Sequence, residues 1–212
     1  MNRIITISRE FGSGGREIGR RLAEKMQIAY YDQEIIIELM NRTDFAEDYI
    51  RHMEEAPIPL LPITTARTFA LPINYVVEQN LRFYMQESKV ILDFAKKSDC
   101  VIVGRCADYI LREMNPVRLF VYADMESKMA RCRKKGGDIE SLSDRELRQK
   151  IISVDKKRAK YYKFYINRTW GDKTNYDLCI NTSRFTEVKA VIPGIESVIA
   201  EFFTIGDCIA DI

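Results

Sequence analysis

The sequence has little of what metal sites and disulfide frameworks require. Its 212 residues include one histidine, His52, and five cysteines, at positions 100, 106, 132, 179 and 208. No two cysteines form a C-x-x-C pair, and their number is odd, so neither a zinc site nor a disulfide framework is expected. We expect reduced thiols in a cytoplasmic protein. Cys100 and Cys179 fall inside predicted strands, and we expect both in the core.

The sequence also lacks a strong charge imbalance and long hydrophobic runs. Lysine and arginine number 33 against 31 acidic residues, so no global field favours nucleic acid or an anionic membrane as a partner. No apolar run reaches the roughly 18 residues of a membrane span. Met1-Asn2-Arg3 leads straight into a predicted strand, so we expect no signal peptide. The length suits one medium domain.

A glycine cluster between a strand and a helix is the most informative stretch that is present. Residues 3–8 (Arg-Ile-Ile-Thr-Ile-Ser) predict a buried strand, and residues 16–26 predict an amphipathic helix. This order aims backbone N–H groups and a helix N-terminus at a phosphate. The candidate cofactor-binding residues are therefore Gly12, Ser13, Gly14, Gly15, Arg16 and Glu17. The alternative is a glycine turn that only joins strand to helix.

The loop matches the P-loop pattern G-x-x-x-x-G-K-[ST] at one of four positions when Gly15 is set at the second glycine. Glu10 then takes the first glycine position, Arg16 the lysine position and Glu17 the Ser/Thr position. The glycines still permit the positive φ angles that turn N–H groups inward. Arg16 can contact β- and γ-phosphate oxygens. A carboxylate at position 17 could hold a metal ion but would repel phosphate.

The rest of the chain alternates between predicted strands and helices. We predict strands at 29–32, 99–104, 116–123 and 176–181, and helices at 74–97, 105–113, 125–135, 144–165 and 186–203. Ser143 and Glu146 form a capping box, and Thr186 is the expected cap of the last helix. Three prolines within 57–63 preclude a regular helix there. The alternation predicts an α/β fold with a parallel sheet of about five strands, covered on both faces.

Charged residues follow two of the predicted strands. Asp32 and Arg105 stand at the carboxyl ends, where open α/β sheets place ligand groups. Asp32 would bind the acceptor or a metal, or cap the next helix. Arg105 would contact a ligand or form a surface salt bridge. Asp155 and Arg158 on a charged helix could simply pair with each other.

Two further features near these residues have competing interpretations. Cys106 beside Arg105 could have a lowered pKa, or it could be a small helix residue. The aromatic cluster of Tyr161, Tyr162, Phe164 and Tyr165 is expected to pack against Trp170 rather than to stack on a base.

Several motifs in order resemble one kinase family. These are I-S-R-E-F-G-S-G-G-R-E-I at 7–18, V-G-R at 103–105, the strand and basic helix at 120–133, D-K-K-R at 155–158, and Y-D-L-C-I-N-T-S at 176–183. They resemble the cytidylate kinases of the nucleoside monophosphate kinase class, most closely the cytidylate-kinase-like branch, over about residues 3–200.

The resemblance implies a P-loop NTPase-type three-layer α/β/α fold and ATP with Mg²⁺ as cofactors. It divides the single domain into a core (1–32, 98–135 and 169–204), a helical acceptor-binding insertion (33–97) and a lid (136–168). It implies catalytic roles for Arg16, Arg131 and Arg158, with substrate-binding roles for Asp32, Arg105 and Asp155. No metal-ligand set of the protein's own is expected. Phosphoryl transfer needs positioning and neutralised charge more than a protein nucleophile.

The expected activity is ATP-dependent phosphorylation of a small phosphorylated acceptor, a nucleoside monophosphate such as CMP or dCMP. Ile151 and Ile152 stand where the family has Arg-Asp, and Cys106 where it has an aspartate. The isoleucines motivate one alternative, a kinase of a non-nucleotide metabolite. Glu10 and Glu17 at loop positions motivate another, a P-loop protein that binds nucleotide or anion without turnover.

Overall fold

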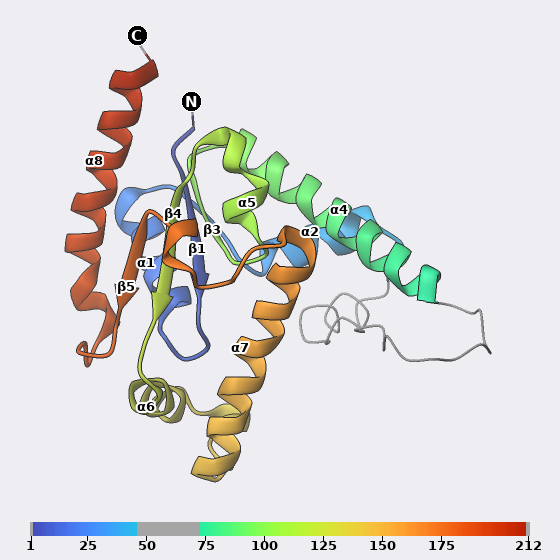
Figure 1. Ribbon diagram of the computed structural model, residues 1–212. Coiled ribbons are helices and arrows are strands. Elements are labelled where there is room, and N and C mark those ends of the chain that lie inside the picture. Colours follow the sequence, from blue (N-terminus) through green and yellow to red (C-terminus); the bar gives the residue numbers. More distant parts are fainter. Residues whose placement is uncertain (1, 46–72, 211–212) are drawn as a thin grey trace.

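A five-stranded parallel sheet forms the centre of the molecule (Figure 1). The computed structural model describes residues 2–45 and 73–210. The strands lie in the order β2 (Ala29–Tyr31), β3 (Cys100–Val103), β1 (Ile4–Arg9), β4 (Val117–Tyr122) and β5 (Leu178–Asn181). All neighbouring strands pair in parallel. The central strands are buried runs of β-branched and apolar residues, as expected for a sheet covered on both faces. The predicted α/β fold is confirmed.

Helices cover both faces of the sheet, making a three-layer structure. α1 (Gly15–Met26) and α8 (Ile192–Ala210) pack on one face. The opposite face carries α2 (Glu34–Arg42), α4 (Ile73–Lys97) and α5 (Ala107–Ile110). Each layer buries its own apolar cluster against the strands, so two cores sandwich the sheet.

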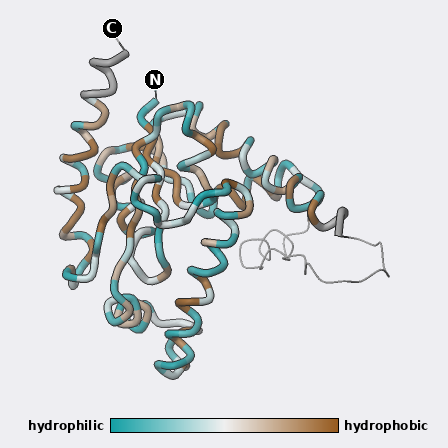
Figure 2. Tube along the Cα trace, viewed as in Figure 1, coloured by the Kyte–Doolittle hydropathy of each residue, from teal (hydrophilic) through white to brown (hydrophobic). Residues whose placement is uncertain are grey.

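Two helices lie beyond the carboxyl ends of the strands. α6 (Met125–Lys135) and α7 (Asp144–Ile166) are more hydrophilic along their length than the sheet and α8 (Figure 2). An apolar cluster joins them to each other, with Cys132 of α6 against Leu147 and Ile151 of α7. The capping box of Ser143 and Glu146 starts α7 as predicted. Short 3₁₀ turns complete the described elements, at Arg112–Met114, Gly137–Ile139, Lys173–Asn175 and Val188–Val191.

Three local predictions were wrong. The helix predicted from 105 begins only at Ala107, because Arg105 and Cys106 both have positive φ angles, 57° and 55°. Thr186 does not cap the last helix, since Glu187 precedes a 3₁₀ turn and α8 starts at Ile192. Cys179 is exposed because β5 lies at the edge of the sheet, whereas Cys100 in β3 is buried as predicted. The proline segment at 57–63 lies outside the described residues.

The order of the strands opens a crevice at the carboxyl ends of β1 and β3. β1 and β3 are neighbours, but α1 follows β1 onto one face while α5 follows β3 onto the other. Ligands of open α/β sheets bind where the connections that follow two adjacent strands go to opposite faces of the sheet. The glycine loop after β1 and Arg105 after β3 therefore flank the same crevice.

Candidate functional site

The glycine loop makes a tight turn from strand to helix. Gly12 and Gly14 have φ angles of 77° and 87°, a region that favours glycine. A β-carbon on Gly14 would lie 2.6 Å from Val188 Cγ2, so a side chain there would also clash. The Ser13 hydroxyl donates to the Glu10 carbonyl oxygen at 2.8 Å, which folds the loop on itself. Helix α1 thus begins with its N-terminus directed into the crevice.

A cleft of about 1380 Å³ runs along this loop and between the helices beyond it. Twelve cationic side chains line it against five carboxylates, although the chain as a whole carries only +2. The positive charge of the protein is therefore concentrated where the glycine loop lies. Such a wall attracts an anionic ligand.

Four arginines from four separate elements come together in the cleft. They are Arg9 at the end of β1, Arg16 in α1, Arg105 after β3 and Arg158 in α7. Burial first, and then the nearby charges of Arg158, Arg16 and Arg105, lower the pKa of Arg9 to about 9 against the opposing charge of Asp32. A cation whose charged form is disfavoured in the folded protein gains most when an anion binds beside it.

Asp32 is the carboxylate that faces this group of arginines. It lies 2.7 Å from Arg16 Nε and 3.7 Å from Arg9 Nη2. It does not cap α2, whose N-cap is Gln33 without a side-chain bond. Asp32 also contributes to raising the pKa of Tyr30 to about 12, after burial as the first cause. The predicted site residues Asp32 and Arg16 thus form an ion pair that joins the end of β2 to the first turn of α1.

Arg105 is held by a buried carboxylate of α4. Its Nη1 lies 2.6 Å from Glu87 Oε1 in α4, with side chains only 9% and 2% exposed. The Tyr161 hydroxyl of α7 donates to the other oxygen of Glu87 at 2.6 Å. Burial and then the charge of Glu87 raise the pKa of Tyr161, so this hydroxyl stays protonated. The segment after β3, α4 and α7 are therefore bonded together at one point.

Asp155 bonds to the glycine loop and to α6. Its Oδ1 accepts from the Phe11 backbone N–H at 2.7 Å, and its Oδ2 lies 3.2 Å from Lys128 Nζ. Lys128 also lies 2.5 Å from Glu10 Oε2. Arg158, three residues after Asp155, lies 3.9 Å from it but donates to the Arg9 carbonyl oxygen at 2.8 Å. We call Lys128, Glu10 and Asp155 the loop-locking triad, because it joins loop, α6 and α7.

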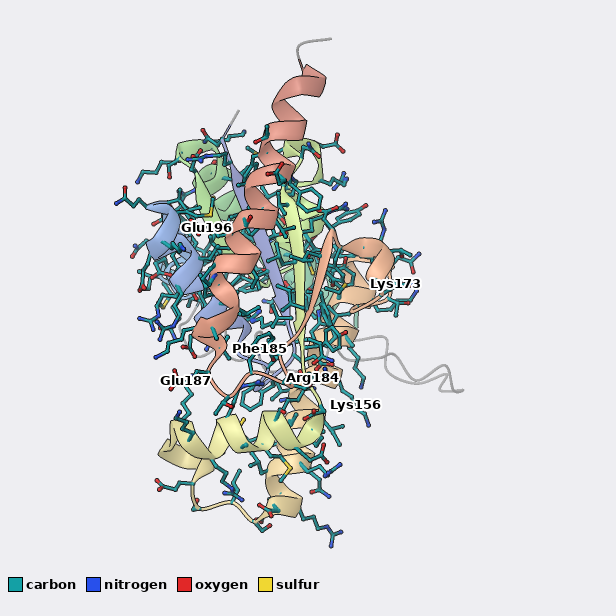
Figure 3. The ribbon with its side chains drawn as sticks, turned by 90° about the vertical axis from the view of Figure 1, so that its left-hand side faces the viewer. Lys156, Lys173, Arg184, Phe185, Glu187 and Glu196 are labelled. Atoms are coloured by element: carbon teal, nitrogen blue, oxygen red, sulfur yellow. The ribbon has the colours of Figure 1, made fainter. Side chains whose placement is uncertain are left out.

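Arg131 also contacts the loop through backbone atoms. It donates to the carbonyl oxygens of Gly12, at 3.4 Å, and Phe185, at 3.2 Å, and to that of Thr182. Figure 3 places Phe185 on the segment between β5 and α8, above α6. The Thr182 hydroxyl in turn donates to the Ser13 carbonyl oxygen at 2.7 Å. Arg131 therefore anchors the loop to this segment, and within the described residues its buried Nε has no hydrogen-bond partner.

The two acidic loop residues that weakened the P-loop match are both neutralised. Glu10 pairs with Lys128 and accepts from the Ala123 backbone N–H at 3.2 Å. Glu17 pairs with Arg21 one helical turn on, at 2.7 Å, and its side chain is 41% exposed. Neither carboxylate leaves an uncompensated charge against a phosphate on the loop.

The aromatic cluster packs around Cys106 at the far side of the cleft. Tyr162, Ile166 and Cys106 are its buried members, with Trp170 and neighbouring tyrosines against them. The Tyr162 hydroxyl donates to Asp108 Oδ2 at 2.6 Å. The predicted packing against Trp170 is therefore observed for Tyr161, Tyr162 and Tyr165, whereas Phe164 is 41% exposed and contacts the ring of Tyr165. Burial, followed by the charge of Asp108, raises the pKa of the Cys106 thiol, the opposite of the lowering considered for it.

We expect Cys106 to react slowly with iodoacetamide at neutral pH, because a buried thiol with a raised pKa holds little thiolate. Exposed Cys179 should be carbamidomethylated well before it. Peptide-level mass spectrometry over a short time course measures both rates in one sample. Equal rates for the two thiols would contradict a closed cluster around Cys106.

Three residues that carry much of the site were missed by the sequence reasoning. Arg9 ends a buried strand, the same pattern that drew attention to Arg105, and could have been found by it. Glu87 and Lys128 had no such pattern, since each is one charge among many on a helix. Only their burial, at 1% and 6% exposed, distinguishes them.

The fold and the cleft define a protein of the P-loop kinase type. A family model described as the cytidylate kinase-like family matches residues 4–184, and the chain belongs to this family. No match was found among curated protein sequences. None of the helices in the described residues is long and apolar enough to cross a bilayer.

Solved structures agree with this fold. An uncharacterized protein from Eubacterium ventriosum ATCC 27560 is 26% identical with a TM-score of 0.66, covering 93% of this chain and 98% of that one. Shikimate kinase from Bacteroides thetaiotaomicron is 16% identical with a TM-score of 0.54, covering 94% of this chain and 99% of that one. The second likeness shows the fold alone.

Proposed function

We propose that the protein transfers a phosphoryl group from ATP to a small acceptor that carries its own phosphate, with CMP or dCMP as the leading candidates. The observation that carries the proposal is the convergence of four arginines on one cleft beside the glycine loop. Asp32 pairs with Arg9 and Arg16, Glu87 pairs with Arg105, and Asp155, near Arg158, is shared with Lys128, so the cations at this point still outnumber the carboxylates and bound anions would neutralise the remaining charge. Transfer of a phosphoryl group between two phosphates needs such a surplus of cations.

The division into core, insertion (33–97) and lid (136–168) gives each residue a role in this proposal. The glycine loop and Arg16 would hold the donor phosphates. Arg105, tied to Glu87 of the insertion, would contact the acceptor phosphate. Arg158 of the lid would approach the group in transfer. Asp155, which we expected to bind the acceptor, and Arg131, which we expected to be catalytic, would act by holding the loop, since their bonds run to its backbone.

The residues fit a magnesium ion that arrives with its nucleotide. The described residues hold no group of three or more His, Cys, Asp and Glu side chains that could cage a metal ion. Magnesium in kinases is held by substrate phosphates, waters and one or two carboxylates. Asp32 and Glu17 both line the cleft and could supply a carboxylate. Bound in this way, the ion would supply charge neutralisation on the phosphates.

A coupled assay of ADP release tests the proposal. Purified protein with ATP and Mg²⁺ should turn over one or more pyrimidine nucleoside monophosphates faster than it hydrolyses ATP alone. ATP binding with no turnover of any acceptor would overturn the phosphotransferase function. The pairing of both Glu10 and Glu17 with cations supports the phosphotransferase proposal, because neither carboxylate is left to repel a phosphate.

Arg105→Met should raise the acceptor KM about 10- to 100-fold, since hydrogen bonds to charged groups contribute about 1.5–3 kcal/mol. The KM for ATP should change little. Arg112→Met is the control, because Arg112 is a half-exposed arginine that pairs with Glu113 and does not line the cleft. Initial rates over a matrix of both substrates measure the two constants. Equal changes in both would place Arg105 outside the acceptor site.

A non-nucleotide acceptor is the second candidate, and the position of Ile151 favours it. Ile151 is fully buried against Cys132 and Leu147, at a position where the family resemblance expects an arginine. The Bacteroides neighbour is described as a shikimate kinase, and its likeness extends to the fold only. A screen of phosphorylated and carboxylated metabolites in the same assay decides between the two acceptor classes.

A further inference from the structure

The ends of β1 and α1 align the glycine loop with the P-loop pattern differently from the alignment that sets Gly15 at the second glycine. β1 ends at Arg9, and α1 begins at Gly15 with Gly14 as its N-cap. The P-loop pattern separates its two glycines by five positions, between a strand and a helix. The step from Arg9 to Gly14 has this length and this location. In this register Arg9 stands at the first glycine, Gly15 at the lysine and Arg16 at the Ser/Thr position.

The side chain of Arg9 fills the space that a residue at position 15 would use. A β-carbon built on Gly15 would lie 3.0 Å from Arg9 Cγ and closer still to Arg9 Cβ. Gly15 is part of a helix and has no positive φ, so the backbone does not require glycine there. The requirement is steric, and its cause is Arg9.

A second glycine makes room for the other end of Arg9. A β-carbon on Gly104, after β3, would lie 3.0 Å from Arg9 Cζ and nearer to Nη1. The guanidinium therefore rests against the end of β3, between the glycine loop and the side of the cleft formed by Asp32 and Arg105. Within the described residues the buried Arg9 Nε has no hydrogen-bond partner.

We propose that Arg9 replaces the P-loop lysine, contacting the β- and γ-phosphate oxygens of the bound nucleotide from the strand side of the loop. The proposal rests on the proposed function and names the residue that holds the transferred phosphoryl group. A guanidinium suits this position because its planar fork bonds two phosphate oxygens at once. The lowered pKa of Arg9 agrees with this proposal, since a bound anion would again favour the charged form of the guanidinium.

Moving the cation from position 9 to position 15 tests the proposal. Arg9→Gly should remove the rise in melting temperature that ATP or inorganic triphosphate produces, and should lower kcat/KM about 100-fold or more. Gly15→Lys should also fail, because its side chain meets the stem of Arg9. The double variant R9G/G15K has its cation at position 15, where the P-loop pattern places the lysine. It should recover at least half of the ligand-induced shift in melting temperature.

Melting temperatures without ligand show whether each variant is folded, and Arg9→Met repeats the test without an added glycine. An unchanged ATP shift in Arg9→Met, or a folded double variant that binds no better than Arg9→Gly, would overturn the proposal. Failure of the proposed function looks different. In that case the wild-type protein turns over no acceptor, while the triphosphate shift still depends on Arg9.

Discussion

Gly104→Ala should lower kcat/KM by about a hundredfold to a thousandfold, the range seen when one preorganised donor is removed from a site of developing charge. Gly104 touches no expected substrate atom. Its substitution acts because a β-carbon there would lie 3.0 Å from Arg9 Cζ and still closer to Nη1. The guanidinium would have to leave the end of β3, and the pair with Asp32 would be lost with it.

The control for Gly104→Ala is Gly137→Ala. Gly104 has a φ angle of 82° and Gly137 one of 76°, so alanine incurs a similar backbone strain of about 1–2 kcal/mol at both. A β-carbon on Gly137, however, meets nothing within 4 Å. Steady-state kinetics and thermal melts of both variants separate displacement of Arg9 from strain. Equal losses of activity in the two variants would contradict the account.

The fold could be predicted from the sequence because its determinants are local. β-branched runs alternate with amphipathic helices, and the capping box of Ser143 and Glu146 marks the start of α7 where it was expected. The errors occur where tertiary structure overrides a local pattern. Arg105 and Cys106 take left-handed conformations beside the crevice, which delays the helix to Ala107.

The candidate site was predicted less completely, since its contacts join distant parts of the chain. Asp32 and Arg105 were found because strand ends meet at one edge of a parallel sheet. Arg9 was not, because setting Gly15 at the second glycine moved the loop pattern by one residue. The structure supplied the missing observation, which is where the strand ends and the helix begins.

Asp155 illustrates how a candidate site residue can be chosen from sequence without its contacts being known. The family resemblance implied that Asp155 binds the acceptor, and the structure shows it bonded to the backbone of the glycine loop. Its partners, Lys128 and the Phe11 N–H, are 27 and 144 positions away in sequence. No periodicity or motif could reveal a bond over such separations. The contribution of the loop-locking triad to stability therefore has to be measured on the folded protein.

Lys128→Met should destabilise the protein by about 3–5 kcal/mol, the usual effect of removing one partner from a buried charge pair. Lys128 is 6% exposed and neutralises both Glu10 and Asp155, so its loss leaves two carboxylates close together. Arg133→Met is the control. Arg133 also joins α6 to α7, through Asp144 at 2.9 Å, but Asp144 is 83% exposed. We expect a loss on the order of 1 kcal/mol there.

The pH dependence of the Lys128→Met defect identifies its cause. Burial already raises the pKa of Asp155, with the Phe11 N–H and Lys128 opposing it. Without Lys128 the folded-state pKa of this carboxyl rises further above its unfolded value. The penalty then falls on the charged form, so it is full at neutral pH and fades as the pH falls and Asp155 becomes protonated in both states.

Urea melts at pH 5 and pH 8 should show the smaller deficit at pH 5. Adding Asp155→Asn to Lys128→Met should recover part of the stability at pH 8, since the amide oxygen still accepts from Phe11. A deficit that is independent of pH and unmoved by Asp155→Asn would mean that Lys128 stabilises the loop by packing alone.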